Sequence, residues 1–308
     1  MTVVDSPAPV SLQLSGRRAR SERIARVLFL VAGLTSVLVS VLILWSLTRE
    51  AWTFVSQVEA AALWTDGWFP RRGMYDIRTI VLGSFLITGI ALLVAIPIGL
   101  SAAIYLSEYA SPRLRRILKP VLEILAGIPS VVLGFFALTF ISPEIVQRFS
   151  DADQFNMLAA GIAVGILVIP LVASVSEDAM RSVPNALREA SYGLGARKIS
   201  TTVRIVIPAA VSGLVAALII AVSRAIGETM VVFVAAGATG GSLFSTNVLG
   251  PGQTMTAAIA SQAAGTDQVV GEGLTFQSLF FVAMLLFIIT LFLNLIADRF
   301  VRRVRQTY

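Results

Sequence analysis

Six long apolar runs dominate this sequence of 308 residues and constrain its fold more than any other feature. A helix needs about 20 apolar residues to cross the hydrocarbon core of a bilayer. Only helices and closed barrels satisfy their backbone hydrogen bonds there. The sequence therefore predicts an all-α polytopic membrane protein with six transmembrane helices. The six runs lie at about residues 27–47, 78–106, 119–141, 156–175, 207–236 and 276–298.

Composition agrees with a membrane protein and limits its chemistry. Hydrophobic residues make up 56% of the chain, charged residues make up 14%, and the mean hydropathy is +0.84. These values lie outside the usual range of soluble domains. The chain has no cysteine and no histidine, which excludes disulfides, thiol catalysis and the common transition-metal sites. We expect no catalytic residue and no metal site on this chain.

The positions of the basic residues predict the topology. Eighteen of the 24 Lys and Arg residues fall before the first run, between the second and third, between the fourth and fifth, or after the sixth. The positive-inside rule assigns these alternate connections to the cytoplasm, with both termini on that side. We expect residues 1–26 to be a cytoplasmic N-terminal tail and residues 27–308 to be the transmembrane domain. The formal net charge of +6 is thereby explained without nucleic-acid binding.

A polar segment between the fourth and fifth runs has the pattern of a docking element. Apolar side chains recur at helical spacing up to Leu194, and glycines at 193 and 195 allow a tight turn after them. Pro208 can open the next helix. We therefore expect an exposed helical elbow. The alternative is an ordinary amphipathic loop between two membrane helices.

Two opposite charges stand inside the fifth apolar run. Arg224 and Glu228 are four residues apart, so a helix would place them on one face. A charge at this depth is costly and normally faces a bundle interior or an aqueous cavity. The guanidinium fork suits an oxyanion, and Glu228 can hold that fork when no anion is bound. The alternative is a buried ion pair that fixes helix packing.

The carboxylate of Glu228 also bears on selectivity among oxyanions. It repels a fully ionised anion but can accept a hydrogen bond from a protonated one, such as hydrogenphosphate. Sulfate carries no proton at neutral pH and cannot donate that bond. This chemistry favours phosphate over sulfate.

Several motifs resemble those of known transporters. The spacing of Glu189, Ala190 and Gly195 resembles the "EAA" loop of ABC-importer permeases, with Ser191 in place of the third alanine. Residues 122–132 and 223–230 look like signatures of phosphate ABC-importer permeases. Residues 97–100, 105–110 and 253–257 are similar to the PstC-type subunit rather than to its PstA-type partner. The resemblance covers about residues 20–305.

The resemblance implies a fold, a site and a set of partners. The fold would be that of type I ABC-importer permeases, a five-helix core plus an N-terminal helix, with a cytoplasmic coupling loop at about residues 176–207. The implied substrate-pathway residues are Arg224, Glu228, Ser223 and Thr229. The implied ATPase-coupling residues are Glu189, Ala190, Gly195, Arg197, Ile205 and Pro208.

The implied assembly joins this chain to a second permease subunit of the PstA type and to two ATPase subunits of the PstB type. An extracytoplasmic phosphate-binding protein would deliver the substrate. The chain has no glycine-rich loop ending in Gly-Lys-Ser or Gly-Lys-Thr, so we expect ATP and Mg²⁺ on the partner ATPase and no cofactor here.

The sequence thus predicts a multi-pass permease subunit in a bacterial cell membrane. It would move inorganic phosphate inward by alternating access and would not itself be an enzyme. Two alternatives remain open. One is a permease for another oxyanion, such as sulfate or molybdate, and the other is an anion transporter driven by an ion gradient.

Overall fold

The computed structural model describes residues 16–237, 241–265 and 273–304. Residues 1–15 of the predicted tail and Arg305 of the last basic cluster lie outside the described residues. The chain forms two compact units, residues 1–49 and residues 50–308. Helix α1 (Gly16–Gln57) begins in the first unit and ends in the second. It starts eleven residues before the predicted apolar run, inside the segment expected to be tail.

Three of the remaining predicted runs form long helices. Helix α2 (Ile77–Ile104) continues into a π-helical turn, η3 (Tyr105–Tyr109). Helix α5 (Met157–Arg181) is capped by Asn156, whose side-chain oxygen accepts a hydrogen bond from the Ala159 N–H at 2.7 Å. Helix α12 (Thr275–Val304) covers the sixth run. These helices form where apolar residues are continuous, because buried backbone groups must then bond within the helix.

The third and fifth runs are bent. In the third, α3 (Pro112–Ala126) is followed by α4 (Ser130–Phe136) and the π-helical η4 (Ala137–Val146), with an 86° bend after Ala126. Pro129 stands at this break. A proline disfavours helical backbone in the residue before it and supplies no N–H to the helix, so it favours a break at this point.

The fifth run divides into α8 (Ile207–Ala209), α9 (Val211–Ile226) and α10 (Met230–Ala235). The helical stretch that ends at Ala209 meets α9 at 71°. The continuous helix predicted over residues 207–236 is therefore wrong. In the described part of the chain, four helices are long and apolar enough to cross a membrane, or six if each bent pair is one span.

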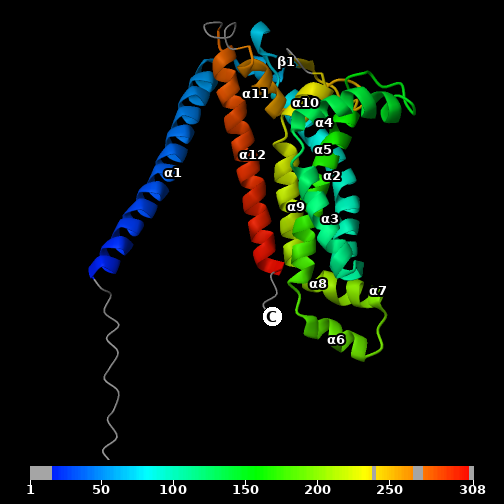
Figure 1. Ribbon diagram of the computed structural model, residues 1–308. Coiled ribbons are helices and arrows are strands. Elements are labelled where there is room, and N and C mark those ends of the chain that lie inside the picture. Colours follow the sequence, from blue (N-terminus) through cyan, green and yellow to red (C-terminus); the bar gives the residue numbers. More distant parts are fainter. Residues whose placement is uncertain (1–15, 238–240, 266–272, 305–308) are drawn as a thin grey trace, which may run out of the picture. The chain divides into compact units, whose positions relative to one another are not determined.

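A small layer of short strands and helices covers one end of the second unit (Figure 1). Strands β1 (Gly67–Phe69), β2 (Met74–Tyr75) and β3 (Ser242–Leu243) form an antiparallel sheet in the order β2-β1-β3. Short 3₁₀ turns, η1 (Ala60–Trp64) and η2 (Pro70–Arg72), flank the first strand. Helix α11 (Met255–Ala263) lies at the same end. The stretch from Gln253 to Ala257 is buried at this end.

The main core lies between α2 and α5. A Cβ on Gly161 would lie 2.6 Å from the side chain of Ile90, and one on Gly165 would lie 2.8 Å from that of Val94. The glycines therefore let the two backbones approach closely, as small residues do in membrane helices. Helices α4, α9 and α10 pack their buried side chains against the same core. A separate small core lies at the other end, where Met180 and Val206 are fully buried.

The segments expected to face opposite sides of the membrane lie at opposite ends of the second unit. Figure 1 shows α6, α7 and α8 at one end and the sheet with α10 and α11 at the other. Helix α9 connects them. Its 16 residues correspond to about 24 Å at the α-helical rise.

Candidate functional site

The predicted helical elbow forms. Helix α6 (Asn185–Gly193) is followed by a turn, α7 (Lys198–Thr201), the π-helical η5 (Thr202–Val206) and α8. Gly195 has a φ of +78°, a backbone conformation that glycine adopts without steric cost. The turn is closed by the N–H of Gly195, which donates to the Tyr192 carbonyl at 2.9 Å. We call residues 185–209 the coupling segment.

Ser191 joins α6, the first arm of the coupling segment, to α7, the start of its second arm. Its side chain is buried, and its hydroxyl lies 2.8 Å from the hydroxyl of Thr201 on α7. Alanine at this position would lack that hydrogen bond. The departure from the EAA pattern at Ser191 therefore has a local structural role.

Most of the predicted coupling residues are exposed. Glu189 and Ala190 lie on α6, Gly195 lies in the turn, Arg197 directly precedes α7, and Pro208 lies in α8. Ile205, in η5, is half buried. Pro208 does not open the membrane helix, because the bend falls after it and α9 begins at Val211.

Apolar side chains project from the same segment. Leu194 is 90% exposed, and Ile199 and Val203 are more than half exposed. A polar segment that exposes large apolar side chains at its turn and on its second arm is typical of an interaction site. The described chain leaves these side chains uncovered.

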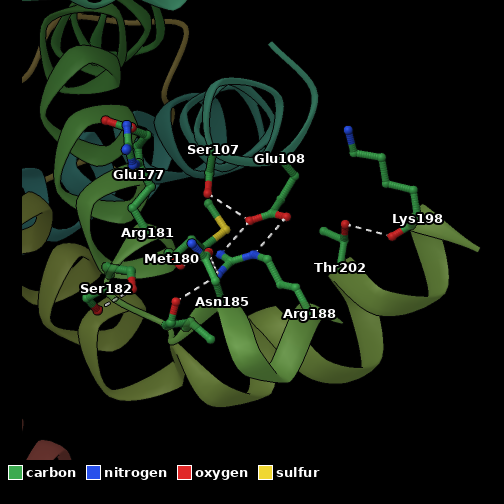
Figure 2. A network of polar contacts seen from close by, with 12 residues as sticks. Ser107, Glu108, Glu177, Met180, Arg181, Ser182, Asn185, Arg188, Lys198 and Thr202 are labelled. Carbon is green, nitrogen blue, oxygen red and sulfur yellow. Dashed lines mark hydrogen bonds and ion pairs between the residues drawn. The ribbon is translucent and has the colours of Figure 1, made fainter. Parts of the chain in front are cut away.

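A buried ion pair that sequence reasoning missed attaches α6 to the helix bundle (Figure 2). The Arg188 guanidinium donates two hydrogen bonds to Glu108 of η3, from Nη2 to Oε1 at 2.8 Å and from Nε to Oε2 at 3.3 Å. It also donates to the carbonyls of Met180 and Val183, at 2.8 and 2.7 Å. The pair is formed by residues 80 positions apart, so neither helical spacing nor a local motif could reveal it.

A second ionic cluster surrounds Glu177 near the end of α5. This carboxylate is fully buried, and it contacts Arg115 and Lys119 of α3 as well as Arg181 at 4.0 Å. Lys119 also bonds to Asp178 at 2.6 Å. The cluster holds α3 against α5. Two adjacent acidic residues at 177–178 follow the fourth apolar run and lie in a connection rich in arginine and lysine. That pattern could have predicted the ionic cluster from the sequence.

The predicted pair in the fifth run is present, but not on the face of one helix. Helix α9 ends at Ile226, and Glu228 lies in the break before α10. Arg224 Nη2 is 3.7 Å from Glu228 Oε2. The arginine side chain is 52% exposed, whereas that of the glutamate is 4% exposed. The carboxylate is thus fixed in the fold and the guanidinium is accessible.

Glu228 is held by two further contacts. Its Oε1 accepts a hydrogen bond from the Val231 N–H at 3.4 Å, at the start of α10. Its backbone carbonyl accepts one from the Thr256 hydroxyl of α11 at 2.7 Å. The pair therefore lies where three elements meet, a placement that the sequence alone did not predict.

The other two predicted pathway residues lie nearby in sequence and have modest roles. Ser223 donates a hydrogen bond to Asn294 of α12 at 2.9 Å, which ties α9 to α12. Thr229 donates to the carbonyl of Gly227 at 3.3 Å within the break. These contacts place Ser223 beside a neighbouring helix and Thr229 in the turn that carries Glu228.

Comparison with known proteins gives a consistent result. A family model described as "Binding-protein-dependent transport system inner membrane component" matches residues 95–306. The phosphate transport system permease protein PstC of Mesorhizobium japonicum is 30% identical over 84% of this chain and 83% of its own length. PstC 1 of Mycobacterium tuberculosis is 33% identical over 79% of this chain and 77% of its own length. PstA 1 of the same organism is 31% identical over 73% of this chain and 71% of its own length.

A solved structure is similar in fold. The similar chain belongs to a bacterial alginate ABC transporter in complex with a periplasmic protein bound to an alginate pentasaccharide. It superposes with a TM-score of 0.64 at 15% identity, over 93% of this chain and 98% of that one. The backbone arrangement is thus that of an ABC-importer membrane subunit.

Proposed function

This chain belongs to the family of binding-protein-dependent transport system inner membrane components, and on that premise we propose that it is the PstC-type permease subunit of an ATP-driven phosphate importer. Its relatives named PstC match over a larger share of the chain than the relative named PstA 1. The observation that carries the proposal is the accessible guanidinium of Arg224 beside the fixed carboxylate of Glu228.

The pair has the properties that a transient oxyanion site requires. The 3.7 Å separation is longer than a charge-assisted hydrogen bond of about 2.7–2.9 Å. An anion can therefore recruit the Arg224 fork without first breaking a tight ion pair. Glu228 Oε2 remains beside that fork as an acceptor, and a protonated phosphate can donate to it. A fully ionised sulfate would meet the carboxylate as a like charge.

The coupling segment supplies the connection to ATP hydrolysis. We propose that Glu189, Ala190, Gly195, Arg197 and the exposed Leu194 contact a separate ATPase subunit. Closure of two such subunits around ATP and Mg²⁺ would move the coupling segment and reorient α9. This coupling requires that the ATPase pair bind one permease conformation more tightly than the other.

The proposed assembly contains this chain, a PstA-type permease, two PstB-type ATPases and an extracytoplasmic phosphate-binding protein. It would lie in the bacterial plasma membrane with both chain termini in the cytoplasm. The exposed basic residues Arg197 and Arg204 of the coupling segment support that orientation through the positive-inside rule. In this assembly the chain is a transport subunit and the ATPase activity belongs to its partners.

Uptake by the reconstituted complex tests the proposal. The complex, co-expressed with its genomic partners, is placed in lipid vesicles with ATP on the coupling-segment side, and entry of radiolabelled phosphate is measured with and without excess sulfate. We expect ATP-dependent uptake that sulfate does not reduce. Arg224→Gln should abolish uptake while the complex still copurifies.

The control is Arg148→Gln, which removes an arginine that is 70% exposed and lies far from the pair in sequence. It should transport normally. Competition by sulfate would identify a broader oxyanion permease, and uptake without the ATPase would identify a gradient-driven transporter. Loss of assembly in Arg224→Gln would assign the pair to packing instead of substrate.

A further inference from the structure

One face of α3 carries charges that the rest of the described chain does not pair. None of the residues of this helix is buried, although α3 packs on α5 and runs lengthwise in the helix bundle (Figure 1). Arg116 and Glu123 are exposed and line the same groove, which has a volume of about 430 Å³. Their spacing of seven residues places them on one side of the helix, about 10 Å apart along its axis. We call the face that bears them the α3 stripe.

The carboxylate of Glu123 has no partner in the described part of the chain. Among the described residues, neither Arg116 nor Glu123 makes an ion pair or a side-chain hydrogen bond. Lys119 lies one turn before Glu123, but its ammonium binds Glu177 and Asp178, at 2.9 and 2.6 Å. The partner of Glu123 must therefore come from outside the described chain.

Glu123 lies at membrane depth. It falls inside the third apolar run, about 10 Å beyond Arg116, which belongs to the basic connection before that run. The long side chain of Arg116 can extend its charge toward the membrane surface, but the shorter glutamate cannot reach that far. An ionisable side chain at this depth is costly in lipid and normally faces protein or an aqueous cavity. The α3 stripe therefore does not face lipid.

Two observations favour a protein surface over an aqueous route. The proposed cargo is an anion, which a lone carboxylate would repel, whereas Glu228 lies beside Arg224 at 3.7 Å. Pro120 lies between the two charges of the α3 stripe and lines the same groove. It supplies no N–H to the Arg116 carbonyl, so the regular helical hydrogen bond to that carbonyl is absent. A carboxylate and a backbone acceptor on one face suit a cationic donor from a neighbouring chain.

We propose that the α3 stripe is a contact surface for the second permease subunit, which places a lysine or arginine beside Glu123 within the membrane. The inference rests on the proposed assembly, in which the second permease is the partner that spans the membrane. A second copy of this chain fits less well. A two-fold axis along the membrane normal places identical residues at the same depth, so α3 stripes that met at this axis would set Glu123 against Glu123. The resulting repulsion favours an unlike partner.

Site-specific photocrosslinking of the assembled complex tests this contact. The photoreactive residue p-benzoylphenylalanine replaces Glu123 in one variant and Val121 in the matched control. Val121 is 46% exposed and, two residues earlier, points to nearly the opposite side of α3. We expect irradiation in lipid nanodiscs to join the variant at 123 to the second permease and to leave the control unjoined. Equal crosslinking at both positions, or an adduct between two copies of this chain, would contradict the proposal.

The requirement for charge is tested by Glu123→Gln, with Glu144→Gln as the control. Both carboxylates are exposed, so neither change should alter the unfolding temperature of the chain alone. Glu123→Gln should raise the concentration at which the detergent-solubilised complex dissociates by about tenfold or more, because it leaves a cation of the partner unpaired. Glu144→Gln should leave that concentration unchanged. Equal dissociation of the two variants would overturn the proposed charge pair.

The remaining outcomes separate this interface from the proposed function. A complex that transports another oxyanion but crosslinks at 123 would support the interface and refute the proposed substrate. A parent preparation without a second permease would overturn the assembly and the interface together. An aqueous route is tested with Glu123→Cys, since the chain has no cysteine of its own. Reaction of this thiol with a charged, water-soluble reagent in the assembled complex would refute the interface alone.

Discussion

The Arg188–Glu108 pair makes a quantitative prediction about the attachment of the coupling segment. The Arg188 side chain is 14% exposed and that of Glu108 is 4% exposed. Arg188→Ala would leave the Glu108 carboxylate with only the hydrogen bond from the Ser107 hydroxyl, at 3.0 Å, and would also remove a donor from the carbonyls of Met180 and Val183. Removing one member of a buried pair costs about 3–5 kcal/mol. We expect Arg188→Ala to reduce stability by that amount.

Glu108→Ala should cost less. Arg188 would keep both of its carbonyl acceptors, so the loss is that of a charged hydrogen-bond partner, about 1.5–3 kcal/mol. The double variant should lose little more stability than Arg188→Ala alone. The reason is that the Glu108 carboxylate, which Arg188→Ala leaves without its ion-pair partner, is absent from the double variant. The two single variants and the double variant therefore form a double-mutant cycle, for which we expect a coupling energy of about 1.5–3 kcal/mol.

SDS titration of the purified chain in detergent micelles measures these free energies. The four tryptophans report unfolding, and none is altered by the substitutions. The matched control is a cycle on Arg148 and Glu144, which are 70% and 59% exposed and 4.0 Å apart. Exposed pairs of this kind contribute little. If the losses in the Arg188 and Glu108 variants add within about 0.5 kcal/mol, the pair does not hold the coupling segment and our reasoning fails.

Two glycines provide further tests, each with a matched control. Gly195→Ala should destabilise the turn by about 1–2 kcal/mol, because the φ of +78° at this position is costly for an L-residue. The same variant should lower ATP-driven uptake. Gly193→Ala, within α6, is the control and should change neither stability nor uptake in this way. Equal uptake by both variants would refute a backbone requirement at the turn. Gly165→Ala should cost about 1–3 kcal/mol by overpacking against Val94, whereas Gly89→Ala, with no atom within 4 Å, should not. Thermal unfolding of the two variants checks this, and similar midpoints would contradict close packing at Gly165.

Some features follow directly from local sequence. Each apolar run lies on helical structure, because an apolar segment that leaves water must pair its backbone groups internally. The coupling segment was predictable for a similar reason. Its glycine at 195 permits the positive φ, and its polar character keeps it outside the hydrophobic core. The pairing of Arg224 with Glu228 was predictable because the two residues are only four positions apart.

Other features depended on contacts between distant segments. The break between α9 and α10 leaves Glu228 buried and Arg224 accessible, an asymmetry that an ideal helix would not produce. Thr256 of α11 stabilises this break by a hydrogen bond to the Glu228 carbonyl, a contact between residues 28 positions apart that no local pattern indicates. The bend after Ala209, not the proline at 208, sets where the membrane helix starts.

The sequence by itself determined where the chain is apolar, where it can turn and which short-range charges can meet. The tertiary structure alone decided that Arg188 reaches Glu108 and that Glu177 contacts cations of both α3 and α5. The physical reason is the range of each effect. Hydrophobic burial and backbone pairing act on consecutive residues, whereas a buried charge is stabilised by whichever partner the folded chain brings within hydrogen-bonding distance.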